Sequence, residues 1–181
     1  MSTPHKPHPK DPAATPKAMG MGMVVGAWLV IMTVGVLAFQ NWFNRASNPN
    51  SDPFSSTDSA GRIHVELEIN RQGHYVADGM VNDERVRFLL DTGATTVAVP
   101  PGIAERAGLP RGARISLNTA NGVSHGFLTR IDTVTLGDIE LHDISGVVAP
   151  GLPDNEVLLG MSFLKHLDWR QAGSKLVLAT R

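Results

Sequence analysis

The longest apolar stretch of the chain runs from Gly20 to Phe39, and no residue between Lys17 and Arg45 carries a charge. At about 1.5 Å per residue, a helix of this length crosses the roughly 30 Å hydrocarbon core of a bilayer. Trp42 follows at the depth where interfacial aromatic side chains are enriched. The pattern predicts a transmembrane helix over residues 19–43.

Beyond residue 60 the pattern changes to short segments in which apolar and polar residues alternate, which is typical of half-buried β-strands. In Ile63–Ile69 the apolar side chains point one way, while His64, Glu66 and Glu68 point the other. Asn121-Gly122 is a strong hairpin signal. The remaining predicted elements are strands at Arg85–Leu90, Ile131–Leu136, Ile139–Leu141, Val147–Val148 and Lys175–Ala179, a short helix over Pro101–Ala107 and another within Leu158–Leu167. The predicted fold class is therefore all-β with one or two short helices.

Composition divides the rest of the chain. Residues 1–18 are rich in Pro, Lys, Ala and Thr, have too little apolar surface to form a core, and are predicted to be a disordered tail. Residues 44–60 are rich in Ser, Asn, Asp and Pro, which predicts a flexible linker. The folded domain is predicted to occupy residues 61–181, which is small but sufficient for one core.

The charges that flank the apolar stretch indicate its orientation. Lys6, Lys10 and Lys17 precede it, whereas only Arg45 follows it closely, so the N-terminus is expected in the cytoplasm and the domain outside it. A cleaved signal peptide is the alternative, because Val36-Leu37-Ala38 resembles a small-residue cleavage site. The apolar stretch is longer than a typical signal-peptide core, which favours a single-pass anchor.

Composition and charge narrow the function classes. The net charge of −1 gives no basic footprint for nucleic acid. The chain has no cysteine, which excludes disulfides, thiolate catalysis and cysteine-based zinc sites. The seven histidines are scattered without a helical His-x-x-x-His pair. No metal site and no cofactor are predicted.

The main candidate for a catalytic segment is Asp91-Thr92-Gly93, which directly follows the apolar strand Phe88–Leu90. Gly93 allows backbone angles and close approaches that other residues resist. The N–H groups of Gly93 and Ala94 are therefore expected to donate to the Asp91 carboxylate. The alternative is that Asp91 only caps a turn, as the Asp-Thr-Gly sequence often does.

A second apolar run, Val157–Leu164, contains Gly160 and ends in a predicted short helix. In this order and at this separation, the two segments resemble the lobe of a retropepsin-like aspartic protease. The resemblance implies a single-lobed acid protease barrel in which Asp91 is the catalytic residue. It implies that the active site is supported by Thr92, Gly93, Ala94 and Gly160, and that a β-hairpin flap formed by Ile115–Phe127 turns at Thr119, Ala120, Asn121 and Gly122.

The resemblance is more specific to the membrane-anchored, retropepsin-like proteases of bacteria, and it covers nearly all of residues 61–181 and the apolar helix. The matching segments are Gly73–Tyr75, Val86–Ala94, Ala107-Gly108, Thr119–Gly122, Val134–Ile139 and Leu158–Leu164. It implies an inner-membrane protein with a periplasmic catalytic domain that acts on proteins or peptides.

Two positions depart from the retroviral members of this family. Thr95 stands where those proteases have an Asp, and Met161 stands where they have an Arg. Both partners of that ion pair are lost together, so the framework is expected to survive while contacts to the substrate main chain change. Thr92 matches the threonine that hydrogen-bonds across the dimer in retropepsins.

Metal-free peptide hydrolysis needs a base to activate water and an acid to protonate the carbonyl, and two close carboxylates that share a proton supply both. The chain has one Asp-Thr-Gly and a domain of single-lobe size, so a homodimer is expected. Gly22 and Gly26 form a small-x-x-x-small pair of the kind that lets membrane helices pair, although glycine is also common in membrane helices that do not pair.

Two other functions are compatible with part of this pattern. An aspartyl phosphatase would need a second Asp where Gly93 stands, and a larger α/β domain, so that function is rejected. A non-catalytic periplasmic peptide-binding or dimerisation module on the same fold remains open.

Overall fold

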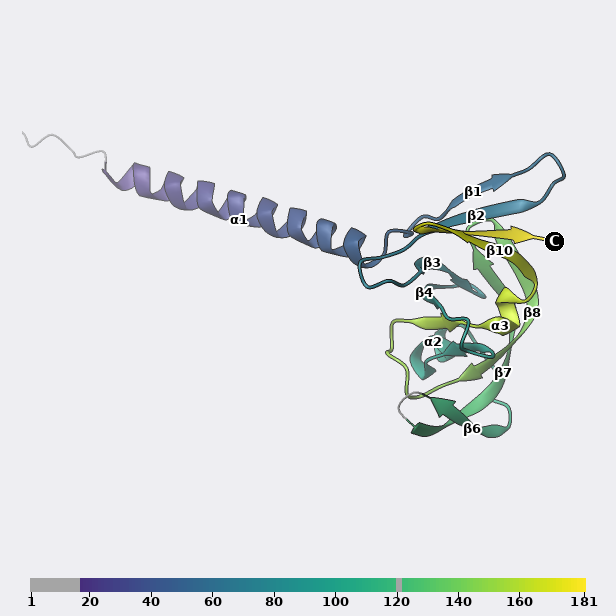
Figure 1. Cartoon of the computed structure of the whole chain (residues 1–181). Helices are drawn as coiled ribbons and strands as arrows, with labels where there is room; N and C mark the ends of the chain where they lie inside the picture. Colours follow the sequence, from purple (N-terminus) through teal and green to yellow (C-terminus); the bar gives the residue numbers. More distant parts are fainter. Residues whose placement is uncertain (1–16, 120–121) are drawn as a thin grey trace, which may run out of the picture. The chain divides into compact units, whose positions relative to one another are not determined.

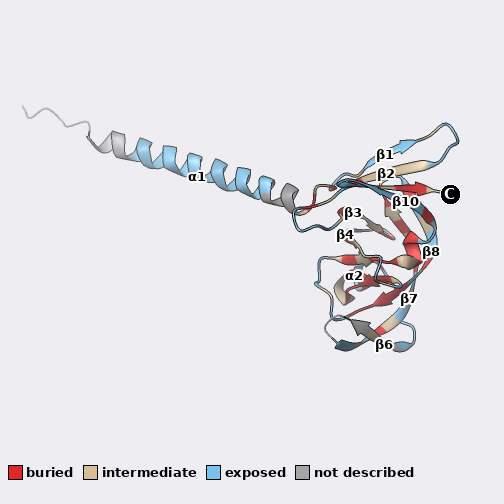
Figure 2. Cartoon of the chain, in the orientation of Figure 1, coloured by how far each residue is buried: buried red, intermediate tan, exposed pale blue. Residues whose placement is uncertain are grey.

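The computed structural model describes residues 17–119 and 122–181 and divides into two compact units, one ending at Asn41 and one formed by Trp42–Arg181 (Figure 1). Helix α1, Lys17–Ser47, contains the predicted span. Its segment Gly22–Gln40 has a mean hydropathy of 2.2. This segment is long and apolar enough to cross a membrane. Side chains 22–40 are all exposed (Figure 2). A signal sequence near the N-terminus has the same properties, so this helix is compatible with both interpretations.

The second unit is a β-domain with two short helices, as the alternating pattern predicted. Its strands are β1 Phe54–Thr57, β2 Ile63–Glu68, β3 Val76–Val81, β4 Glu84–Leu90, β5 Val97–Val99, β6 Arg114–Thr119, β7 Gly122–Leu136, β8 Ile139–Val148, β9 Val157–Leu159, β10 Leu167–Ala172 and β11 Lys175–Thr180. Its helices are α2 Pro101–Arg106 and α3 Met161–Leu164.

The larger sheet has the order β3-β4-β9-β5-β8-β7-β6, and an additional pairing of β3 with β7 closes six of these strands into a barrel. The closure requires a glycine. A Cβ at Gly79 on β3 would lie 2.3 Å from the carbonyl oxygen of Thr135 on β7. Only a residue without a side chain lets the two strands approach this closely. The single-lobed barrel is thus confirmed.

The core is formed by side chains of the barrel strands together with side chains of β2, β11 and the two short helices, and Figure 2 shows buried segments along the strands. Val65 and Leu67 of β2 are fully buried and Glu68 is exposed, so the predicted alternation of this strand is confirmed. The largest fully buried side chains are Phe88 and Phe163, which come from the two segments that the sequence analysis paired.

One predicted boundary differs inside the barrel. Ile139–Leu141 and Val147–Val148 were expected to be separate strands, but they form one strand, β8. The intervening residues His142–Ser145 include the buried Ile144 and a positive φ of 58° at Asp143, and they stay in the strand because β7 pairs with β8 on both sides of Asp143.

The N-terminal part of the domain differs more strongly from the prediction. Residues 44–60 were expected to form a flexible linker, yet β1 lies within them and pairs with β2 in a second sheet of order β1-β2-β11-β10. Asn48 and Asn50 are only 2% and 4% exposed. The folded unit therefore begins before residue 61, because Asn48 bonds to the Asp78 side chain and Asn50 bonds to the carbonyl oxygens of Glu68 and Val76.

Candidate active site

Asp91 lies where β4 leaves the barrel wall. β4 runs parallel to β9, with Leu90 opposite Leu159. The N–H of Asp91 then donates to the carbonyl oxygen of Leu159 at 3.2 Å. Because β9 also pairs with β5, at Ala98, it lies between the strand that enters the Asp91 turn and the strand that leaves it. Both ends of the turn are therefore fixed to one central strand.

Within residues 17–119 and 122–181, one main-chain donor holds the Asp91 carboxylate. The N–H of Gly93 donates to Oδ1 of Asp91 at 2.8 Å. A Cβ at Gly93 would lie 3.1 Å from that same oxygen, so glycine permits the close approach. The predicted second donor is different, because the Ala94 N–H bonds to the main-chain oxygen of Asp91 at 3.2 Å and not to the carboxylate. The side chain is half-buried, which leaves part of the carboxylate accessible.

The second predicted segment packs against the far side of this turn. A Cβ at Gly160 would lie 2.4 Å from the carbonyl oxygen of Thr96 and 2.7 Å from that of Ala94. The next residue, Met161, donates its N–H to the Ala94 oxygen at 2.8 Å. A glycine at position 160 therefore lets α3 begin directly on the Asp91 turn.

One member of this frame was missed by the sequence analysis. Ser162, only 7% exposed, accepts the N–H of Val97 at its Oγ at 2.9 Å. This bond fixes the start of β5 to α3. The available signal was a lone hydroxyl within the apolar run Val157–Leu164, at a position that an apolar residue would otherwise fill.

The predicted flap is a hairpin formed by β6 and β7, in which Thr119 pairs with Gly122. Ala120 and Asn121, the middle of the predicted tip, lie outside the described residues. Ile115 and Leu117 of β6 pack on a small buried cluster that includes Ala98 and is contacted by Leu158. The base of the hairpin is thus attached to the strands that position Asp91.

A cavity of about 260 Å³ opens beside Asp91. It is lined by Tyr75, Leu90, Asp91, Thr92, Leu164, Trp169, Gln171, Leu176 and Leu178. Most of these side chains are apolar, and Trp169 of β10 is 49% exposed. The hydroxyl of Tyr75 is buried and lacks a hydrogen-bond partner within the described part of the chain. The sequence analysis did not connect the C-terminal hairpin with Asp91.

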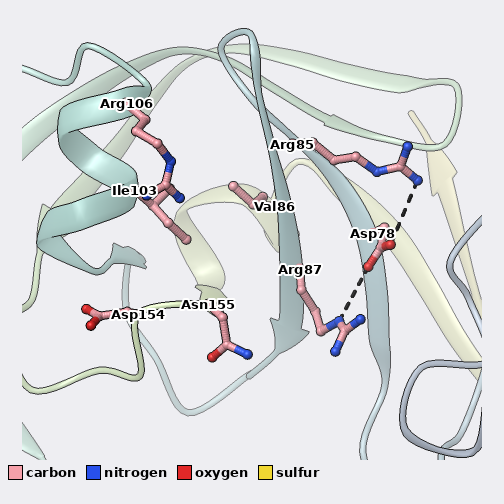
Figure 3. Close-up of a pocket in the computed structure, with 8 residues that line it drawn as sticks. All are labelled: Asp78, Arg85, Val86, Arg87, Ile103, Arg106, Asp154 and Asn155. Atoms are coloured by element: carbon pink, nitrogen blue, oxygen red, sulfur yellow. Dashed lines mark hydrogen bonds and ion pairs between the residues drawn. The ribbon is translucent and has the colours of Figure 1, made fainter. Parts of the chain in front are cut away.

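A separate pocket of about 340 Å³ lies between α2, β3, β4 and the loop before β9 (Figure 3). Its lining combines Asp78, Arg85 and Arg87, and Figure 3 shows both arginines directed at Asp78, at N–O distances of 3.8 and 3.5 Å. Arg106 of this pocket pairs with Glu84. Asp78 and the three arginines are thus engaged in ion pairs with one another or with Glu84.

No group of three His, Cys, Asp or Glu side chains close enough to hold a metal ion occurs among residues 17–119 and 122–181. Asp78, Asp132 and Asp143 are other carboxylates of the domain that could in principle pair with Asp91 within one chain. None of the three lines the cavity beside Asp91, and Asp143 is paired with Arg130.

Comparison with known proteins identifies the fold. A family model described as "gag-polyprotein putative aspartyl protease" matches residues 77–166, which include both Asp91 and Gly160. The crystal structure of a retropepsin-like aspartic protease from Rickettsia conorii superposes with a TM-score of 0.53 at 27% identity, over 70% of this chain and 95% of that one. This domain belongs to the retropepsin-like aspartic proteases.

Two further matches were found. The EIAV protease complexed with the inhibitor HBY-793 matches with a TM-score of 0.43 at 23% identity, over 53% of this chain and 89% of its own. An uncharacterized protein in the cobV 5' region of Sinorhizobium sp is 32% identical over 118 residues. That match covers 64% of this chain and 51% of the relative, so this chain spans about half the length of that protein.

Thr95 and Met161, the two positions that differ from the retroviral proteases, lie in the frame of the Asp91 turn. Thr95 is exposed within the Asp91 turn and Met161 is half-buried at the start of α3. Neither carries a charge, and the contact between their segments is made instead by the main-chain bond from Met161 to Ala94. Thr92 is exposed in the single chain, where it lines the cavity beside Asp91.

Proposed function

We propose that this protein is a membrane-anchored aspartic endopeptidase that hydrolyses peptide bonds with a pair of Asp91 carboxylates from two chains. The observation that carries the proposal is the Asp91 turn. One carboxylate oxygen is fixed by the Gly93 N–H, and the turn is held between β9 and α3. A half-buried carboxylate on a rigid frame, beside an open cavity, is suited to act on a bound peptide.

The proposed chemistry needs two carboxylates. When two Asp91 side chains meet across a twofold axis, both cannot ionise comfortably, so they share one proton. The ionised carboxylate takes a proton from water as the water oxygen attacks the peptide carbonyl carbon. The protonated carboxyl donates its proton to the carbonyl oxygen. The C–N bond then breaks as the first carboxyl gives its proton to the nitrogen. The second carboxylate takes a proton from a hydroxyl of the tetrahedral diol as the new carbonyl forms, so the pair again shares one proton.

Replacement of the carboxylate tests this activity. In the full chain in detergent, Asp91→Asn should lower the cleavage of a fluorogenic peptide library by roughly 10²–10⁴-fold, the usual contribution of acid–base catalysis. The melting temperature should change little, because the amide oxygen can still accept the Gly93 N–H. Asp132→Asn, which removes an exposed carboxylate on β7, is the matched control. Equal cleavage by the parent and by Asp91→Asn would contradict the assignment.

The surface proposed for dimerisation is the outer edge of β10. This strand is at one end of the smaller sheet, and five of its six residues are exposed. Trp169 and Gln171 on it line the cavity beside Asp91, so pairing here brings a second chain next to the site. The opposite edge, β1, is partly covered, because Ser55 Oγ accepts the Asp138 N–H at 3.0 Å. An open edge strand is a template for pairing with another chain.

The absence of cysteine makes this surface easy to map. Single cysteines at each of positions 168–172 should form interchain disulfides on mild oxidation, with a maximum at the position nearest the twofold axis. Ser56→Cys on the edge strand β1 should cross-link much less. Equal cross-linking from both edges, or none from β10 in an active preparation, would contradict this dimer.

The proposed location is the bacterial inner membrane, with the N-terminus in the cytoplasm and the retropepsin-like domain in the periplasm. The support is the apolar segment Gly22–Gln40 and the excess of lysine before it. An alkaline phosphatase fused after Arg181 should be active, and a reporter that works only in the cytoplasm should be inactive. The reverse result would invert the topology.

A second candidate function is supported by Thr95 and Met161, which remove a charged pair found in retroviral members. A domain altered in this way would bind peptides without cleaving them. Peptide binding that is equally strong for the parent and for Asp91→Asn, with cleavage by neither, would favour this peptide-binding module.

A further inference from the structure

The segment between the apolar span and the first sheet is held by the domain. The N–H₂ of Asn70 donates to the carbonyl oxygen of Ser47 at 3.1 Å. Asn48 donates to Asp78 at 2.6 Å. Asn50 donates to the carbonyl oxygens of Glu68 and Val76 at 2.9 and 2.7 Å. These bonds tie residues 47–50 to β2, β3 and the turn between them.

The turn that receives Ser47 is rigid and presents a cation. Residues 70–74 join β2 to β3, and both the Gln72 and His74 N–H groups bond to Asn70 Oδ1, at 2.9 and 3.0 Å. Arg71, Gln72 and His74 are exposed. The Arg71 guanidinium lies 4.8 Å from the ring centre of Trp42, within the range of a cation–π contact.

The position of Trp42 in the chain sets the height of this turn above the membrane. Trp42 is two residues beyond Gln40, the last residue of the apolar span, which corresponds to about 3 Å along a helix. Tryptophan is enriched at this level of the interface. A guanidinium stacked on that ring is therefore at the depth of the lipid phosphates, which arginine binds by charge-assisted hydrogen bonds.

We propose that the turn 70–74 docks the domain on the phospholipid headgroups, with Arg71 between the Trp42 ring and a lipid phosphate. This inference rests on the membrane anchoring proposed above. It adds a lipid-binding surface on the catalytic domain itself, so that the domain is held on the bilayer surface.

Docking would also set the distance of Asp91 from the membrane surface. Tyr75 follows the turn directly, and its carbonyl oxygen accepts the N–H of Leu90 at 3.0 Å. Asp91 is the next residue. Strand geometry places Asp91 within roughly 15 Å of the turn. A docked domain therefore acts on polypeptide segments that lie close to the membrane.

Spin labels test the docking in the full chain, reconstituted in vesicles of phosphatidylcholine and phosphatidylglycerol. A nitroxide on Gln72→Cys should be broadened strongly by a nickel-chelating lipid and weakly by a dissolved nickel complex. A nitroxide on Val123→Cys should show the reverse. Val123 is 72% exposed on the β6–β7 hairpin, and Figure 1 shows this hairpin and β2 at opposite ends of the domain.

A charge reversal tests the role of Arg71. In the Gln72→Cys background, Arg71→Glu should lower the broadening by the nickel lipid severalfold. Arg111→Glu is the matched control, because Arg111 is also exposed and its guanidinium lies 5.8 Å from the ring of Phe127. Arg111→Glu should leave the broadening at residue 72 unchanged, and both variants should keep the parent melting temperature.

The outcomes separate this inference from the proposed anchor. A chain that does not float with the vesicles overturns the anchor and the docking together. A chain that floats, but whose label at 72 is as distant from the lipid as the label at 123, overturns the docking alone. Unchanged broadening with Arg71→Glu also overturns it. Peptide cleavage is not used in any of these measurements.

Discussion

The Asp91 turn and the segment 48–58 both use a short polar side chain to organise backbone groups, and they differ in how much of that side chain is used. The described residues give the Asp91 carboxylate one hydrogen bond, from Gly93, and leave it half-buried. Asn50, in contrast, is 4% exposed, donates to two carbonyl oxygens, and accepts the N–H of Glu68 at 2.7 Å.

The comparison separates a side chain available for chemistry from one consumed by folding. A buried polar group must find partners, because leaving it unsatisfied costs free energy. Asn50 meets that requirement fully and has nothing left for a substrate. Asp91 is held by one oxygen while part of its carboxylate remains accessible, which is the arrangement expected of a reactive group on a rigid frame.

The largest effect on stability is expected at the frame of the Asp91 turn. Gly160→Ala places a Cβ 2.4 Å from the Thr96 oxygen, so the turn and α3 must separate. We expect a loss of at least about 3 kcal/mol in the free energy of unfolding, together with loss of cleavage. Gly102→Ala on α2 is the control, since its Cβ would meet nothing closer than 3.7 Å. That change should stabilise the helix by up to about 1 kcal/mol.

Chemical denaturation of both variants checks this prediction. A Gly160→Ala protein as stable as the Gly102→Ala protein would show that the turn has more freedom than its contacts indicate. The Asp91 turn would then not be the rigid frame that distinguishes it from the fully hydrogen-bonded Asn50.

The next largest effect is expected in the N-terminal segment. Asn50→Ala leaves the Glu68 N–H and the carbonyl oxygens of Glu68 and Val76 without this partner, which should cost about 2–4 kcal/mol. Cleavage per folded molecule should be unchanged. Asn155→Ala, at an exposed position, should stay within about 0.5 kcal/mol of the parent. A neutral Asn50→Ala would mean that residues 44–60 behave as the linker predicted from composition.

The same two segments show what the sequence can predict. The Asp91 turn is recognisable because its determinants are local: an apolar strand, an aspartate and a glycine in succession. Gly160 belongs to a similar short pattern. The barrel follows from alternating strands and from the resemblance that these two patterns carry.

The N-terminal segment was not predictable for a physical reason. Asn50 is buried only because β2 and β3, 18 and 26 residues further along the chain, present their carbonyl oxygens to it. Locally, the Ser, Asn, Asp and Pro residues around it have the composition of a linker. Ser162 presents the same difficulty, because its partner Val97 is 65 residues away. Side chains whose roles depend on distant backbone atoms leave little local signal.

The smallest expected effect concerns Asp58, a partly exposed polar residue in the hairpin between β1 and β2. Its Oδ2 lies 3.1 Å from His64 Nε2, and its Oδ1 accepts the N–H groups of Ala60 and Arg62 at 2.9 and 3.0 Å. The hydrogen bond with His64, followed by the one from the Arg62 N–H, lowers the pKa of Asp58 well below its usual value. The ionised form is therefore favoured in the folded state.

A lowered pKa in the folded state gives a defined dependence of stability on pH. The contribution of Asp58 is fully present above the unfolded pKa of about 3.9 and is lost as the pH falls through the folded value. Asp58→Asn should therefore lower the melting temperature slightly at neutral pH, and the difference from the parent should shrink below about pH 4. Added salt should reduce it further, because the group is near the surface. Asp52→Asn in the same segment controls for the loss of one charge, and an identical pH profile for both variants would show that the contacts of Asp58 contribute nothing to folding.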